Sequence, residues 1–208
     1  MNQTPKTQCA LALAGQHPTE LPHMHQVARL AALLFDALRG LHGLGDREGE
    51  LLTCAALLHD IGLEAVAVGH HRASLKLILE AELPALSRGE KLVVANVARY
   101  HRKALPSLAH PHFAQLAAPD REAVSKLAAI LRIADGLDRV HDSAVTRLEA
   151  DPCEPGIYAL WIDGPGDLAH AAWGAERKAD LFREVFGFDL AIRCGPPPGR
   201  RSGRATRP

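Results

Sequence analysis

The residues of this chain that could do chemistry are histidines and aspartates. Twelve histidines occur among 208 residues, and histidine is the commonest metal ligand in proteins. His59 and Asp60 stand together at the end of an apolar helical pattern, which Gly62 stops. An imidazole nitrogen beside a carboxylate oxygen is a mixed ligand set that suits Mn, Fe, Zn or Mg. The pair therefore predicts a site for a divalent cation.

Two more residues are expected to complete this site. His25 shares a stripe with Ala28 and Phe35 at helical spacing, so we expect its side chain to point inward. Asp135 lies on the apolar stripe of a later helix, where a carboxylate is costly unless it is paired or bound to a metal. Three helices then supply the ligands of one ion, which are His25, His59, Asp60 and Asp135.

The elements that must position these residues are mainly helical. Apolar residues make up 47% of the chain but aromatic residues only 4%, so small aliphatic side chains must fill the core, which suits close helix packing. Periodicity predicts helices over about 20–41, 47–60, 71–83, 87–101 and 120–138. Strand-like alternation follows at 144–150, 157–162 and 189–193, with a helix over 167–186.

This pattern predicts four parts. They are a flexible leader over residues 1–18, a helical domain over 19–142, a small α/β subdomain over 143–194 and a disordered basic tail over 195–208. The tail is rich in Pro, Gly and Arg and has too few apolar residues to order itself.

The composition limits the classes of partner and the cellular compartment that are expected for this protein. Lys plus Arg equal Asp plus Glu at 24 each, so net charge does not draw the protein to nucleic acid or to an anionic membrane. No apolar run reaches transmembrane length. The four cysteines are far apart and form no CxxC pair, which favours a reducing, cytoplasmic location.

Several strings of the sequence carry a family resemblance. HDIG at 59–62 and RIADGLDR at 132–139 resemble HD-domain metal-dependent phosphohydrolases. HMHQVARLAALLFDAL, AALLHDIGL, HHRASLKLI, ARYHRKALP and KLAAILRIADGLDRVH look like the C-terminal region of the exopolyphosphatase and guanosine pentaphosphate phosphohydrolase (Ppx/GppA) family. This likeness runs from about residue 21 to residue 193.

The resemblance implies a fold and an activity. The fold is an HD-type helical bundle with a small C-terminal α/β subdomain. The activity is metal-dependent hydrolysis of a phosphate ester or anhydride of a small molecule, with a nucleotide or a guanosine polyphosphate as the expected class. Family members place actin-like domains ahead of this region, and this chain has no room for them, so catalysis is expected at the HD residues. The alternative is a non-catalytic module that binds nucleotide or phosphate for regulation or that forms a homodimer.

The resemblance also implies further site residues. Phosphohydrolases with two ions add histidines between the dyad and the last aspartate, which points to His71 and His101 as metal ligands, for one or two ions in all. His70 could replace His71, since adjacent residues of a helix point about 100° apart. His59 and Asp60 are then the catalytic residues, and Asp60 also orients the attacking water.

Basic residues near these positions are expected to bind the phosphate of the small phosphorylated substrate through charge-assisted hydrogen bonds. They are Arg72, Arg102, Lys103 and Arg139. Arg102 and Lys103 are the first choice because they directly follow His101. Asp138 is either a hydrogen-bond acceptor for a ligating histidine or an ion-pair partner of Arg139.

Overall fold

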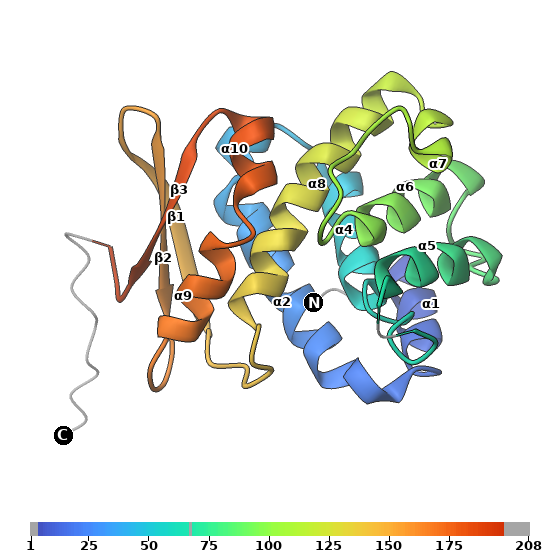
Figure 1. Cartoon of the computed structure of the whole chain (residues 1–208), viewed down its shortest axis with the longest axis horizontal. Helices are drawn as coiled ribbons and strands as arrows, with labels where there is room; N and C mark the ends of the chain where they lie inside the picture. The colour runs from blue at the N-terminus through green and yellow to red at the C-terminus, as the bar shows by residue number, and fades with distance from the viewer. Residues whose placement is uncertain (1–3, 67, 198–208) are drawn as a thin grey trace.

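The structure is a computed structural model that describes residues 4–66 and 68–197. Figure 1 shows a helical body with a three-stranded sheet at one end. The body comprises η1 (Pro18–Glu20) and the helices α1 (Pro5–Ala14), α2 (Leu21–Ala37), α3 (Arg39–His42), α4 (Asp46–Leu58), α5 (His70–Glu80), α6 (Arg88–Arg99), α7 (Pro111–Ala114) and α8 (Ala118–Leu137). The end comprises β1 (Arg147–Glu154), β2 (Ile157–Asp163), α9 (Ala169–Glu176), α10 (Asp180–Phe186) and β3 (Asp189–Cys194). The predicted mainly α-helical fold with a small C-terminal α/β subdomain is confirmed.

Helix α8 runs through the middle of the molecule (Figure 1). Every residue from Leu127 to Leu137 is buried, because α2, α4 and α6 of the body and α9 and α10 of the subdomain all pack against this helix. A helix that is buried all round brings its polar residues into the interior, so Arg132 and Asp135 lie inside the protein. Within the two described ranges, no helix is both long enough and apolar enough to cross a membrane.

The start of α6 is a capping box formed by Ser87 and Glu90. The Ser87 hydroxyl accepts a hydrogen bond from the Glu90 backbone N–H at 3.3 Å, and the Glu90 carboxylate accepts one from the Ser87 N–H at 3.0 Å. These bonds satisfy backbone donors that the first helical turn leaves without partners. The cap fixes the register of α6, whose other end leads directly into His101.

The prediction of a flexible leader over residues 1–18 is wrong for Pro5–Ala14, which form α1. Thr4 caps this helix, and Ala10 and Ala14 are fully buried because α1 packs against α4. Lys6 also pairs with Glu50 at 2.9 Å and with Glu90 at 2.8 Å. The basic tail predicted over 195–208 lies outside the described residues from position 198 onward.

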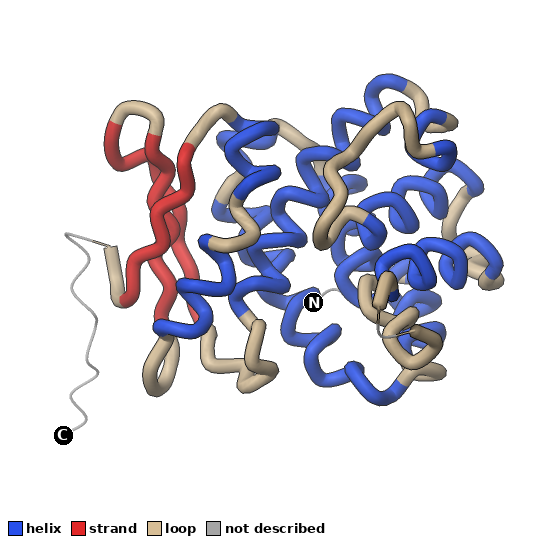
Figure 2. The backbone as a smooth tube through the Cα atoms, viewed as in Figure 1, coloured by secondary structure: helices blue, strands red, loops and turns tan. Residues whose placement is uncertain are grey.

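The three strands lie in the order β1-β2-β3, with β1 and β2 antiparallel and β2 and β3 parallel. Parallel neighbours need a crossover connection, which α9 and α10 provide between the sheet and α8 (Figure 2). The single helix predicted over 167–186 is therefore two helices, separated by a turn at 177–179. This turn carries Lys178 toward α8.

Two glycines allow α8 and α9 to touch through their backbones. A Cβ atom added to Gly174 would lie 2.2 Å from the Gly136 carbonyl oxygen, and one added to Gly136 would lie 2.6 Å from the Gly174 carbonyl oxygen. Real side chains do not approach a backbone atom so closely. The absence of side chains at both positions therefore sets how near the C-terminal subdomain comes to Asp135.

We predict that Gly174→Ala lowers the free energy of unfolding by about 1–3 kcal/mol, the usual cost of adding a methyl group to a tightly packed core. The methyl group would meet backbone, which cannot rotate away, so α8 and α9 must separate. Urea denaturation measures the effect. Gly89→Ala in α6 is the matched control, because nothing lies within 4 Å of a Cβ there; it should stabilise by about 0.5–1 kcal/mol. Equal effects of the two substitutions would show that the glycine contact is not needed.

Candidate metal centre

Histidines and aspartates from separate elements meet beside α8. Two groups have ligand atoms that all lie within 4.8 Å of one another: His23, His59 and Asp60 form the first, and Asp60, His70 and His101 form the second. Asp60 belongs to both groups. We call these residues together with Asp135 the histidine–aspartate cluster, because Asp135 lies 3.5 Å from His23. The structure thus brings together His59, Asp60, His101 and Asp135 of the predicted ligands.

The prediction that His25 points inward is wrong. His25 is exposed, and His23 on the same helix is 3% exposed. Two residues along an α-helix differ by about 200° in direction, so the two side chains lie on opposite faces. The buried face of α2 passes through Val27 and Leu30, and His23 is in phase with it. That stripe was the sequence signal that could have identified His23.

His70 takes the position in the cluster that His71 was predicted to hold. The His70 Nε2 atom lies 3.2 Å from Asp60 Oδ1, whereas the buried His71 is in neither group of ligand atoms. Gly62 makes this approach possible, because a Cβ atom there would lie 2.5 Å from the His70 carbonyl oxygen. The turn after Asp60 therefore packs directly on the first turn of α5, and the alternative that names His70 is the one that the geometry favours.

Backbone carbonyls orient two of the histidine rings. The Nδ1 atom of His59 lies 2.7 Å from the Ala56 carbonyl oxygen, and that of His101 lies 2.7 Å from the Ala98 carbonyl oxygen. A carbonyl only accepts, so Nδ1 carries the proton, and Nε2 of the neutral ring has a lone pair that faces the cluster. Burial also lowers the pKa of His101 to about 3. Metal-binding histidines are held in this way by their second nitrogen.

Asp60 is surrounded by acceptors. Its Oδ1 atom lies 3.2 Å from His70 Nε2 and 3.4 Å from His101 Nε2, and its Oδ2 atom lies 3.5 Å from His59 Nε2. Arg102 Nη1 lies 3.2 Å from His70 Nε2, and because an arginine can only donate, this nitrogen also accepts. Asp60 Oδ1 and His59 Nε2 are buried and have no hydrogen-bond partner among the described residues. Burial by itself raises the pKa of Asp60, but His59, His70 and His101 outweigh that effect and hold it well below its ordinary value, so Asp60 is an anion.

At the other side of the cluster, Asp138 and Asp135 both face His23. The His23 Nδ1 atom lies 2.7 Å from Asp138 Oδ2, and Asp138 also accepts from the Ser143 N–H at 2.9 Å. Burial by itself lowers the pKa of His23, but the two carboxylates outweigh that effect and raise it to about 9. Of the two roles that the sequence left open for Asp138, the contact with a cluster histidine is the one observed.

Lys178 reaches the cluster from the C-terminal subdomain. Its ammonium group pairs with Asp135 Oδ2. Burial alone would raise the pKa of Asp135, but Lys178 and His23 hold it well below its ordinary value. The sequence pattern did not indicate Lys178, because it lies in a turn after α9 and shares no periodicity or motif with the other residues.

The predicted phosphate-binding residues lie in three different places. Arg102 contacts His70 and thus adjoins the cluster. Arg72 and Lys103 are exposed, on α5 and just after His101. Arg139 lies elsewhere, with its guanidinium carbon 4.9 Å from the centre of the Trp173 ring. This stacking on an aromatic face is a cation–π contact, and it occupies the side chain at the interface with α9.

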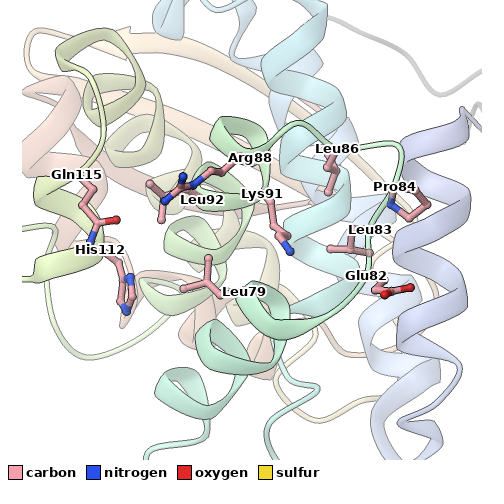
Figure 3. Close-up of a pocket in the computed structure, with 10 residues that line it drawn as sticks. All are labelled: Leu79, Glu82, Leu83, Pro84, Leu86, Arg88, Lys91, Leu92, His112 and Gln115. Carbon is pink, nitrogen blue, oxygen red and sulfur yellow. The ribbon is translucent and has the colours of Figure 1, made fainter.

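A surface pocket of about 680 Å³ lies away from this cluster, between α5, α6 and α7 (Figure 3). Its lining is mixed, with leucines beside Glu82, Arg88 and Lys91. Lys91 donates to the Ala81 carbonyl oxygen at 2.9 Å, so one of the charged groups that line the pocket is already engaged. None of the residues that line this pocket belongs to the histidine–aspartate cluster. The convergence of ligand atoms therefore identifies the candidate site better than pocket size does.

Known proteins share this sequence pattern. Three curated relatives are named guanosine-5'-triphosphate,3'-diphosphate pyrophosphatase. They come from Vibrio campbellii (strain ATCC BAA-1116), Vibrio vulnificus (strain YJ016) and Vibrio parahaemolyticus serotype O3:K6 (strain RIMD 2210633), and are 28%, 25% and 27% identical over 188 residues. Each alignment covers 87% of this chain but 36% of the relative. The chain therefore spans little more than a third of the relatives' length.

The family model described as Ppx/GppA phosphatase, domain III, matches residues 6–154. This match runs from α1 to the end of β1 and contains the whole histidine–aspartate cluster. It covers more than half of the sequence. The chain therefore belongs to the Ppx/GppA phosphatase family, in the region that the family model describes as domain III.

Proposed function

We propose that this protein is an HD-type phosphohydrolase that binds divalent cations at the histidine–aspartate cluster and cleaves a phosphate ester or anhydride of a small molecule. The observation that carries this proposal is the surroundings of Asp60. Among the described residues, no Lys or Arg nitrogen lies within 4.0 Å of this carboxylate, and the histidine nitrogens around it present lone pairs. A cation between them would satisfy all of these groups.

The donor set fits one or two such ions. His23, His59, Asp60 and Asp135 would hold the first, and Asp60, His70 and His101 would hold the second. Imidazole nitrogens with carboxylate oxygens suit Mn, Fe, Zn or Mg. When bound, such ions polarise a phosphoryl oxygen and lower the pKa of a water molecule.

The chain's own side chains would bind and orient the substrate. Arg102 stands at the edge of the cluster and can donate two parallel hydrogen bonds to a phosphoryl group. Asp60 can accept a hydrogen bond from the attacking water and so point its lone pair at phosphorus. Lys103 and Arg72 add positive charge at the exposed side, which favours the approach of an anion.

The names of the relatives suggest the substrate class. Because three of them are guanosine-5'-triphosphate,3'-diphosphate pyrophosphatases, we propose a guanosine polyphosphate as the first compound to test. The chain covers only part of those proteins, so other nucleotides and phosphate esters belong in the same panel.

Asp60→Asn tests the proposal. The substitution keeps the shape but removes the charge, so we expect loss of bound divalent cation and a fall in phosphate release to background. Metal analysis of the purified protein and phosphate release in Mn, Mg, Fe and Zn measure the two effects. Asp36→Asn, at an exposed position of α2, is the control and should change neither. Wild-type protein that binds no cation and releases no phosphate would instead support a non-catalytic binding module.

The helix phase of α2 gives a second test. His23→Ala should weaken cation binding by about 100-fold or more, since even the partners of metal ligands contribute about 10–100-fold. His25→Ala, the same change two residues later, should leave binding unchanged because that side chain is exposed. Calorimetric titration with Mn measures both affinities. If His25→Ala were the damaging change, the assignment of His23 would be wrong.

Lys178 gives a third test. Its ammonium competes with any cation for Asp135, so Lys178→Met should tighten binding of the divalent cation by about tenfold, or about 1.4 kcal/mol. Lys126→Met is the matched control, because the two lysine side chains are 20% and 21% exposed and Lys126 pairs instead with Glu122. Weaker binding in Lys178→Met would mean that the lysine supports the cation site rather than competing with it.

A further inference from the structure

Arg99 is a buried cation without a counterion. It is the last residue of α6 and is 9% exposed. Its guanidinium carbon lies 5.6 Å from the centre of the Tyr100 ring, and its Nη1 atom is buried without a hydrogen-bond partner among the described residues. Among the described residues, no carboxylate oxygen lies within 4.0 Å of it. Removing a guanidinium from water without an anion is unfavourable. An unpaired arginine in such a position indicates that an anion from outside the chain binds to it.

Arg132 shows what a paired arginine looks like in the same region. It is 3% exposed, and its guanidinium donates to the carbonyl oxygens of Tyr100, Lys103 and Ala104 and to Asp180. Arg132 is therefore fully engaged in holding the segment after α6 against α10. Arg99 contacts the face of the Tyr100 ring, but its Nη1 atom has no hydrogen-bond partner among the described residues, so its polar group is not satisfied as that of Arg132 is.

The surroundings of Arg99 are positive. The adjacent helix α5 presents His71, which is 4% exposed and whose Nδ1 atom has no hydrogen-bond partner. Burial and the charges of Arg99, Arg102 and Lys103 lower the pKa of His71 to about 4. Burial and the charge of Arg72 likewise lower the pKa of Arg99 itself. Two unpartnered nitrogens thus lie in one cationic region next to the cluster.

We propose that Arg99 and His71 form an anion subsite that binds a phosphate group of the ligand. A guanidinium matches a phosphate group in shape and offers it parallel hydrogen bonds, and a histidine nitrogen adds a further donor. The subsite adjoins the cluster, since the His71 ring lies 6.0 Å from the ring of His70 and 6.4 Å from that of His101.

This position gives the subsite a role in substrate choice, which rests on the proposed function. The phosphoryl group that is cleaved would lie at the cluster, beside Arg102, and the Arg99 subsite would hold a second phosphoryl group that is not cleaved. Molecules with two or more phosphoryl groups are then better substrates than monophosphates. Existence of the anion subsite itself does not require catalysis.

The experiment uses the full chain in excess chelator, so that no phosphate is bound through a metal ion. Inorganic phosphate is the probe, with sodium chloride at equal ionic strength as the reference. We expect phosphate to raise the melting temperature of the wild type, because a ligand that binds the folded state stabilises it. Arg99→Met should lose this increase. Arg88→Met is the matched control, since Arg88 begins the same helix and is exposed, and it should keep the increase.

Two outcomes overturn the proposal. One is a wild type that phosphate does not stabilise, and the other is an Arg99→Met variant that phosphate stabilises as much as the wild type. Without phosphate, Arg99→Met should be at least as stable as the wild type, because it removes an unpaired buried charge. If that variant does not fold, His71→Leu replaces it and should weaken phosphate binding about tenfold. Asp60→Asn should still bind phosphate in chelator, which separates failure of the subsite from failure of the proposed catalysis.

Discussion

The histidine–aspartate cluster depends on one electrostatic requirement, which is positive charge for buried carboxylates. Asp135 obtains this charge from Lys178 and from His23. Asp60 has only histidine nitrogens around it, and at least two of those rings turn their protons away toward backbone carbonyls. One side of the cluster is thus neutralised by the protein and the other is not. We therefore propose that a cation would bind at Asp60 first.

The fold brings segments that are far apart in the sequence to α8, where their side chains surround the two carboxylates. The body supplies His23, His59, His70 and His101, whereas Lys178 comes from the subdomain that follows. The approach of that subdomain depends on Gly136 and Gly174, whose backbones are in contact. Loss of that contact would move Lys178 and change the charge at Asp135 without altering any residue of the body. The C-terminal subdomain is therefore able to tune the cluster through a single lysine.

The sequence was sufficient for the parts of the fold and site that depend on local patterns. The interior position of Asp135 and the placing of His59 beside Asp60 each follow from the pattern along a single helix. Two assignments depended on helix phase, which the sequence did not fix. His23 and His25 differ by about 200° around α2, and His70 and His71 differ by about 100°, one residue step. Lys178 could not be found in this way, since only the tertiary crossover places it near Asp135.

Two buried arginines also have roles that the sequence pattern could not distinguish. Arg99 and Arg132 are both buried near the segment that follows α6, and nothing in the sequence distinguishes them. Their roles differ because Arg132 finds three carbonyl oxygens and a carboxylate, whereas the Nη1 atom of Arg99 finds no partner. A paired buried cation stabilises the fold that surrounds it, and an unpaired one leaves its hydrogen-bonding capacity to a ligand. The partners of a buried charge, more than its residue type, therefore separate structural residues from binding residues in this protein.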